Sequence, residues 1–112
     1  MAVTISNIIP AKTAENTQTT QYTSTNVQTI IDKFTATNYN TAAATISVNL
    51  VANGDTPDND NLIVKAKTLQ PSETYTFPEL VGQVLANGTF ISTIAGTASA
   101  INIRASGRIV TQ

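Results

Sequence analysis

The acid-base chemistry open to this chain rests mainly on its seven carboxylates, because the sequence contains neither His nor Cys. His is the commonest general base and Cys is intrinsically a very good nucleophile, so most hydrolase mechanisms are disfavoured. A pair of carboxylates could still serve glycoside hydrolysis. Most of the seven stand in predicted turns and loops, however, where a carboxylate is usually solvated. We therefore expect no enzymatic activity. The seven are Glu15, Asp32, Asp55, Asp58, Asp60, Glu73 and Glu79.

One acidic loop, Asn53–Asn61, has an oxygen-rich composition that suits calcium. Calcium prefers several carboxylate and carbonyl oxygens, and Asp58 and Asp60 would supply two carboxylates. Counted from Asp58, however, the sixth position is Ile63, where an EF-hand loop has Gly, and the twelfth is Leu69, where it has Glu. The sequence favours a polar loop tip here, and we expect no metal and no cofactor.

The basic side chains of the strand-rich part of the sequence are few and dispersed. They could pair with acidic groups of a partner, although isolated surface bases are usually only solvated. A net charge of −1 provides no field that would attract nucleic acid or an anionic membrane, so we expect neither as a partner. No segment has the pattern of a signal peptide or of a transmembrane helix. The five basic residues are Lys33, Lys65, Lys67, Arg104 and Arg108.

The composition predicts a single all-β domain. The 112 residues include twenty Thr and eleven Asn, while only 12% are charged. Branched Thr suits a pleated strand and Asn suits turns, so this composition is atypical of a helical bundle. Solubility must rest on neutral polar groups, and without Cys no disulfide can contribute to stability.

The clearest strand pattern lies within Ile30–Ala52. From Ala44 onward apolar and polar residues alternate, which predicts a strand with one buried face that includes Val48. The preceding residues from Ile30 alternate less regularly, and Asn38–Thr41 supply a turn. We predict an antiparallel hairpin with Tyr39 at its tip.

Four further strands and one short helix are expected after this hairpin. The helix is predicted over Pro78–Gly88, because Pro and an early Glu precede apolar residues at helical spacing and Asn-Gly follows them. A pair of short strands is the alternative for that segment. Gly107 is expected to mark a bulge in the last strand. The four strands are Leu62–Leu69, Thr74–Phe77, Thr89–Ala95 and Ala100–Val110.

Residues 1–26 differ from the rest because their apolar side chains are sparse. We predict an extended N-terminal arm over 1–26 and a β-sandwich domain over 27–112. Leaving Ile8 and Ile9 in water would cost about 1.5–3 kcal/mol each. Part of the arm is therefore expected to pair with a sheet, its own or a neighbour's, and a flexible tail is the alternative. Deletion of residues 1–20 is expected to leave the sandwich folded and to remove its binding.

Short strands at turn spacings near ten residues predict a small antiparallel β-sandwich with at most one short helix. Sequence pattern does not determine strand order. The choice of a jelly-roll order rests on a family resemblance.

The sequence resembles small virion proteins of tailed bacteriophages from Gln21 to Gly107. The resemblance is carried by QYTSTN, IIDKFTATN, the alternating TISVNLV, LQPSETYTFPELVGQVL and ASAINIRASG. In length and Thr-rich β pattern the chain is similar to the cement or stapling proteins that decorate short-tailed phage capsids. The resemblance implies a jelly-roll made in the host cytoplasm and carried on the capsid surface. It also implies the major capsid protein as partner, with a homodimer or other homo-oligomer, and it transfers no catalytic residue.

Two alternatives to a capsid decoration protein stay open. One is a structural module of the phage tail or fibre, and the other is a carbohydrate-binding module, for which Tyr39 would be the single plausible aromatic contact. The residues we expect at a partner interface are the apolar and aromatic side chains of the arm, the hairpin tip and two arginines. They are Val3, Ile5, Ile8, Ile9, Tyr22, Tyr39, Arg104 and Arg108.

Overall fold

The computed structural model describes residues 2–111, which form nine strands and a single turn of 3-10 helix. The all-β prediction is confirmed. The elements are β1 (Ala2–Thr13), β2 (Thr19–Thr23), β3 (Gln28–Asn38), β4 (Ala44–Val51), η1 (Asn59–Asn61), β5 (Leu62–Leu69), β6 (Thr74–Tyr75), β7 (Val84–Leu85), β8 (Phe90–Ala95) and β9 (Ile101–Thr111).

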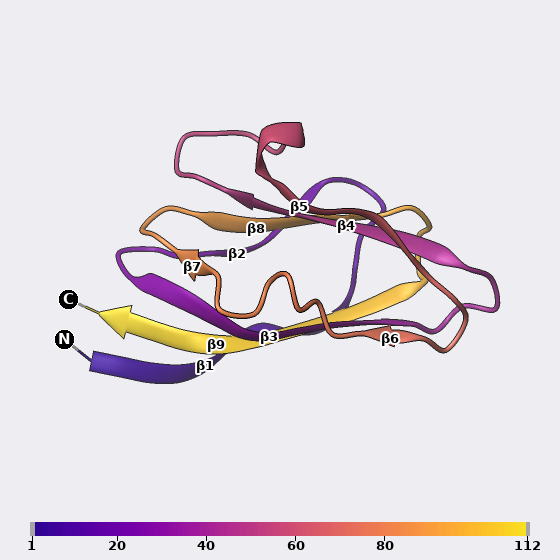
Figure 1. Cartoon of the computed structure of the whole chain (residues 1–112), viewed down its shortest axis with the longest axis horizontal. Helices are drawn as coiled ribbons and strands as arrows, with labels where there is room; N and C mark the ends of the chain where they lie inside the picture. The colour runs from indigo at the N-terminus through magenta and orange to yellow at the C-terminus, as the bar shows by residue number, and fades with distance from the viewer. Residues whose placement is uncertain (1, 112) are drawn as a thin grey trace.

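The strands form two antiparallel sheets that pack face to face as a sandwich (Figure 1). Sheet A has the order β1-β9-β3-β6, and the short β7 also pairs with β3. Sheet B has the order β2-β8-β4-β5. The predicted antiparallel sandwich is confirmed, and β5, β8 and β9 match the predicted strands to within a residue or two at each end.

The predicted hairpin of β3 and β4 is wrong, because the two strands belong to different sheets. β3 pairs with β6, β7 and β9, whereas β4 pairs with β5 and β8. The predicted turn is present, but it carries the chain from one sheet to the other. The buried Asn38 side chain fixes this corner. Its Nδ2 donates to the carbonyl oxygens of Ala42 and Leu69, both at 2.9 Å, and its Oδ1 accepts a hydrogen bond from the backbone amide of Asn40.

Residues 2–26 belong to the sandwich, so the predicted division into an arm and a domain at residue 26 is wrong. β1 pairs with β9 of sheet A, from Ala2 opposite Thr111 to Thr13 opposite Asn102. β2 pairs with β8 of sheet B. The expectation that part of this segment pairs with its own sheet is confirmed. Ile8 and Ile9 explain the integration, because both side chains are buried in the core.

The helix predicted over Pro78–Gly88 is wrong, and the segment consists of turns followed by β7. This segment lies alongside β3. The Gly82 amide donates to the Ile31 carbonyl oxygen at 2.7 Å, and the Ile31 amide donates to the Gln83 carbonyl oxygen at 3.0 Å. Gly82 has φ of +84°, a left-handed conformation that interrupts a helix. These bonds to β3 take the place of helical ones.

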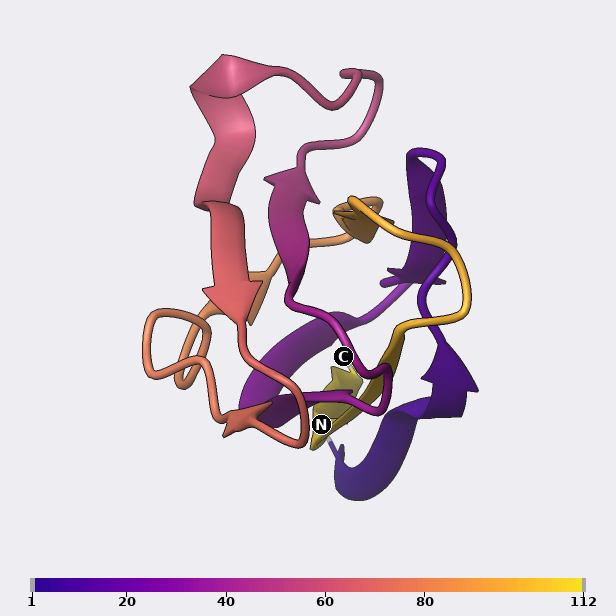
Figure 2. The same cartoon turned by 90° about the vertical axis from the view of Figure 1, so that its right-hand side faces the viewer.

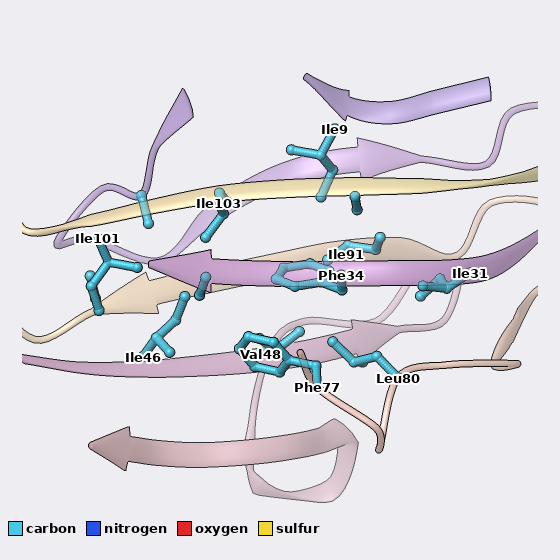
Figure 3. Close-up of a cluster of buried hydrophobic side chains, with 14 of the residues drawn as sticks. Ile9, Ile31, Phe34, Ile46, Val48, Phe77, Leu80, Ile91, Ile101 and Ile103 are labelled. Atoms are coloured by element: carbon cyan, nitrogen blue, oxygen red, sulfur yellow. The ribbon is translucent and has the colours of Figure 1, made fainter. Parts of the chain in front are cut away.

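The core lies between the two sheets and is drawn in Figure 3. β9 directs Ile101, Ile103 and Ala105 into it. Sheet B contributes Ile46 and Val48 from β4, both fully buried. Two aromatic rings pack edge to face in its centre, Phe34 of β3 and Phe77 of the β6–β7 connection, with ring centroids 4.8 Å apart.

We predict that Val48→Asp unfolds the protein. Val48 is fully buried, so the substitution places a carboxylate without a partner in an apolar core. The penalty is comparable to the total stability of a small domain, about 5–15 kcal/mol. Circular dichroism and thermal melting measure the effect. Thr68→Asp, on an exposed position of β5, is the control and should melt as the wild type does; a cooperative Val48→Asp transition near the wild-type temperature would contradict the core assignment.

We also predict that deleting residues 1–20 unfolds the chain, contrary to the sequence-based expectation. The deletion removes β1, which covers one edge of β9, and takes Ile8 and Ile9 out of the core. Loss of two buried Ile side chains alone costs about 4–10 kcal/mol. Loss of the cooperative melting transition is the expected result. Val3→Thr, an exposed position on the same strand, should change stability by less than about 0.5 kcal/mol.

Candidate interaction face

The outer face of sheet B is partly covered by the loop 53–61, which lies on the side of that sheet away from sheet A (Figure 2). Asn49 and Ser92 are opposite each other on this face, and both are almost completely buried. The Asn49 amide donates to the Asp58 carbonyl oxygen at 2.9 Å and to the Asn61 side-chain oxygen at 2.6 Å. Gln18 donates to the Ser92 hydroxyl at 2.8 Å. These polar groups bond within the chain, which leaves few of them free for a partner.

The outer face of sheet A, by contrast, stays open and carries large apolar side chains. Cross-strand neighbours in an antiparallel sheet point to the same face. One row across the sheet runs from Ile5 through Arg108 and Ile30 to Val84. The row beside it places Val3 opposite Val110. We call the apolar members of these two rows the apolar patch: Val3, Ile5, Ile30, Val84 and Val110.

The apolar patch is exposed to a degree that is unusual for branched side chains. Ile5 is 86% exposed, Val3 59% and Val84 57%. Single exposed apolar residues need no explanation, but adjacent ones on one sheet face indicate a surface that contacts a partner. The patch is therefore the strongest binding feature of the described residues.

Gly107 sets the arrangement of charges beside the patch. A Cβ at this position would collide with the carbonyl oxygen of Ile30, so only Gly lets β3 approach β9 here. Next to it the register of β3 shifts, and Asp32 is the extra residue. The bulge thus lies on β3 rather than on β9, where it was predicted. Asp32 forms an ion pair with Arg108 across the strands, with N to O distances of 2.9–3.1 Å.

Two further cations on the same face form no ion pair within the described residues. Lys33 is opposite Ser106, and Arg104 is opposite Thr35, so the four side chains adjoin one another. Lys33 and Arg104 form no ion pair within residues 2–111. They border a hollow of about 180 Å³, which is smaller than a typical ligand pocket of about 300–1,000 Å³. Its size and charge suit one acidic side chain. We call Lys33, Arg104 and Arg108 the basic cluster.

Only half of the predicted interface residues lie on this face. Val3, Ile5, Arg104 and Arg108 do. The prediction for Ile8 and Ile9 is wrong, because the two side chains are 5% and 1% exposed and lie in the core.

The two tyrosines of the predicted set lie elsewhere. Tyr22 is partly buried against the core, and its hydroxyl is 2.8 Å from that of Thr29, so it has a structural role within the sandwich. Tyr39 is 54% exposed at the β3–β4 corner, at the opposite end of β3 from the apolar patch, and bonds to the Thr13 hydroxyl at 3.2 Å.

Sequence reasoning missed Ile30, Val84, Val110 and Lys33 as members of the face. Ile30 and Val110 lie in predicted strands, but the pattern does not indicate that their side chains point outward. For Val84 the sequence predicts a helix. Only the pairing of β7 with β3 brings Val84 beside Ile30, and that pairing joins residues more than fifty positions apart.

The side chains whose pKa is shifted lie away from the outer face of sheet A. The pKa of Glu15 is lowered by hydrogen bonds from Lys12 at 2.8 Å and from Gln21 at 2.9 Å. The pKa of Tyr75 is raised, and that of Glu79 is lowered, by the hydrogen bond between the two side chains. Both groups stabilise connections between strands.

Within residues 2–111, no three acidic side chains gather where they could hold a metal ion. The described chain also has no helix that is long and apolar enough to cross a membrane.

Comparison with protein families, with curated proteins and with solved structures finds no match to this chain.

We predict that Gly107→Ala destabilises the protein by about 1–3 kcal/mol, because the added methyl group meets backbone and forces β3 and β9 apart. Gly96→Ala is the matched control. There the one close contact of the methyl group is with the Thr45 hydroxyl, which can rotate away, so the loss should be smaller. Chemical denaturation measures both variants, and equal losses would contradict the role given to Gly107.

Proposed function

We propose that this protein is a structural virion protein that binds the outside of a phage capsid shell as a cement or decoration protein. The observation that carries the proposal is the open outer face of sheet A, where the apolar patch adjoins the basic cluster. The face spans three or more strands, which suits attachment to a broad protein surface rather than to a small molecule.

The resemblance to phage cement and stapling proteins supports this reading. The strand order supports it too. Sheet A, in the order β1-β9-β3-β6, faces sheet B, in the order β2-β8-β4-β5, and this interleaving of two Greek keys is expected of a jelly-roll. The low charge of the chain suits a protein present in many copies, since repeated weak contacts give firm attachment to a repeating shell.

The partner surface should carry carboxylates facing Lys33 and Arg104. These cations have no acidic partner in the described chain, and their hollow has room for a single side chain. The apolar patch next to them would supply most of the buried apolar area, while the charges would set orientation and the rate of encounter.

The test uses phage particles assembled without this protein and then mixed with the purified chain. Wild-type protein should bind in proportion to the number of capsomers, measured by sedimentation and gel densitometry. Arg104→Glu should lower the affinity by at least about tenfold, because it sets a negative charge against a carboxylate. Binding should also weaken with added salt.

Lys65→Glu is the matched control, because Lys65 is likewise an exposed cation on a strand, but on β5 of sheet B. It should decorate particles as the wild type does. Equal losses for both variants would contradict binding through sheet A. Binding of only a few copies at one vertex would place the protein at the tail, and absence of any binding would overturn the virion proposal.

A further inference from the structure

The outer edge of β1 is protected along only half of its length. Within residues 2–111, β1 is the margin of sheet A and has no strand beyond it (Figure 2). Its second half carries the features that prevent pairing at a free edge, namely register shifts after Ser6 and after Ile9, Pro10 and the charge of Lys12. Its first half, Ala2–Ser6, is regular, uncharged and free of Pro. An edge of this kind is a template for another strand.

The backbone groups that face outward on this half belong to Val3 and Ile5. The amide and the carbonyl of Ala2 both contact the Thr111 hydroxyl, so they point toward β9. Hydrogen-bonding direction alternates along an antiparallel strand. Thr4 and Ser6 therefore also point toward β9, while the amides and carbonyls of Val3 and Ile5 point away from the sheet.

We infer that Ala2–Ser6 pairs with the same segment of a second copy of this chain, antiparallel and about a twofold axis at Thr4. In this register Val3 lies opposite Ile5 of the partner subunit and Ile5 opposite the partner's Val3. Each of these two pairs exchanges an amide-to-carbonyl bond in both directions, which satisfies all four outward groups of each strand. The two sheets A then form one continuous sheet.

The segment itself favours a second copy over an unrelated strand. Ala-Val-Thr-Ile-Ser reads nearly the same in both directions, with a small residue at each end and a branched apolar residue on either side of Thr4. A twofold interface requires such self-complementarity. Val3 and Ile5 of each copy would come together on the outer face, so the side chains that are most exposed in the single chain would cover one another. No like charges meet, because the segment has none.

The first test is the mass of the full chain in solution by analytical ultracentrifugation. We expect a dimer at micromolar concentration. Ile5→Lys should weaken it by at least about tenfold, because the symmetric interface loses two apolar side chains and gains two like charges. Val84→Lys is the control: it changes another exposed residue of the apolar patch, across the sheet from β1, and should leave the dimer unchanged.

A second variant distinguishes pairing through the edge of β1 from contact through the outer face of sheet A. Val3→Pro removes an amide that points outward and so takes no bond from the β1–β9 ladder. It should give a folded monomer, verified by circular dichroism. A monomeric wild type, or a dimer that survives both Ile5→Lys and Val3→Pro, would overturn the inference.

Register is tested by disulfide formation, for which the chain is convenient because it has no Cys. Thr4→Cys should give a covalent dimer on mild oxidation, since residues facing each other at a non-hydrogen-bonded position have Cα atoms about 4.5 Å apart, within the range of a disulfide. Ile5→Cys should crosslink much less, because the two copies of residue 5 lie diagonally. The reverse result would overturn the register. These measurements need no phage particle, so they succeed or fail independently of the capsid proposal.

Discussion

β9 is hydrogen-bonded to a neighbour along both of its edges, and much of the sandwich depends on this. It joins β1 to β3, the first and third strands of the chain, and so brings residues from both ends of the sequence into one sheet. Gly107 lies on the inward face of β9, where the Ile30 carbonyl approaches too closely for any other residue. That approach produces the bulge at Asp32 and thereby the ion pair with Arg108. The absence of a side chain at Gly107 thus influences where the charges lie on the exposed face.

The buried face of β4 could be predicted from the sequence, because alternation is a local property of a strand. Val48 points inward as the pattern indicated. Which strands pair with one another is not a local property of the sequence. β3 and β4 have apolar faces that would suit a hairpin or two facing sheets equally, and a short polar connection allows both. The deciding contacts are those of the Asn38 amide with Ala42 and Leu69, and the second of these joins residues thirty-one positions apart.

The wrong predictions share a physical cause. Ile8 and Ile9 are consecutive, which a regular strand cannot bury on one face, but the register shift between Ser6 and Ile9 lets both point inward. Residues 78–86 have a helical pattern, but hydrogen bonds with Ile31 hold them beside β3. In each case a long-range pairing overrides the local pattern. The interface prediction failed for Ile8 and Ile9 for the same reason, because sequence pattern alone treats a sparse segment as separate from the core.

The two outer faces of the sandwich differ in the sign of their charged side chains and in whether a loop covers them. The loop over sheet B carries Asp55, Asp58 and Asp60, all exposed, and its backbone and amide groups bond to the buried polar face beneath it. Sheet A carries the basic cluster with Asp32 as the single carboxylate bonded to it. A partner that binds sheet A would therefore leave the acidic loop on the far side, facing solvent. The acidic loops of copies bound side by side would carry like charges, which opposes contact between the loops of neighbouring copies. The charge arrangement is therefore consistent with attachment through sheet A while the acidic loops stay apart.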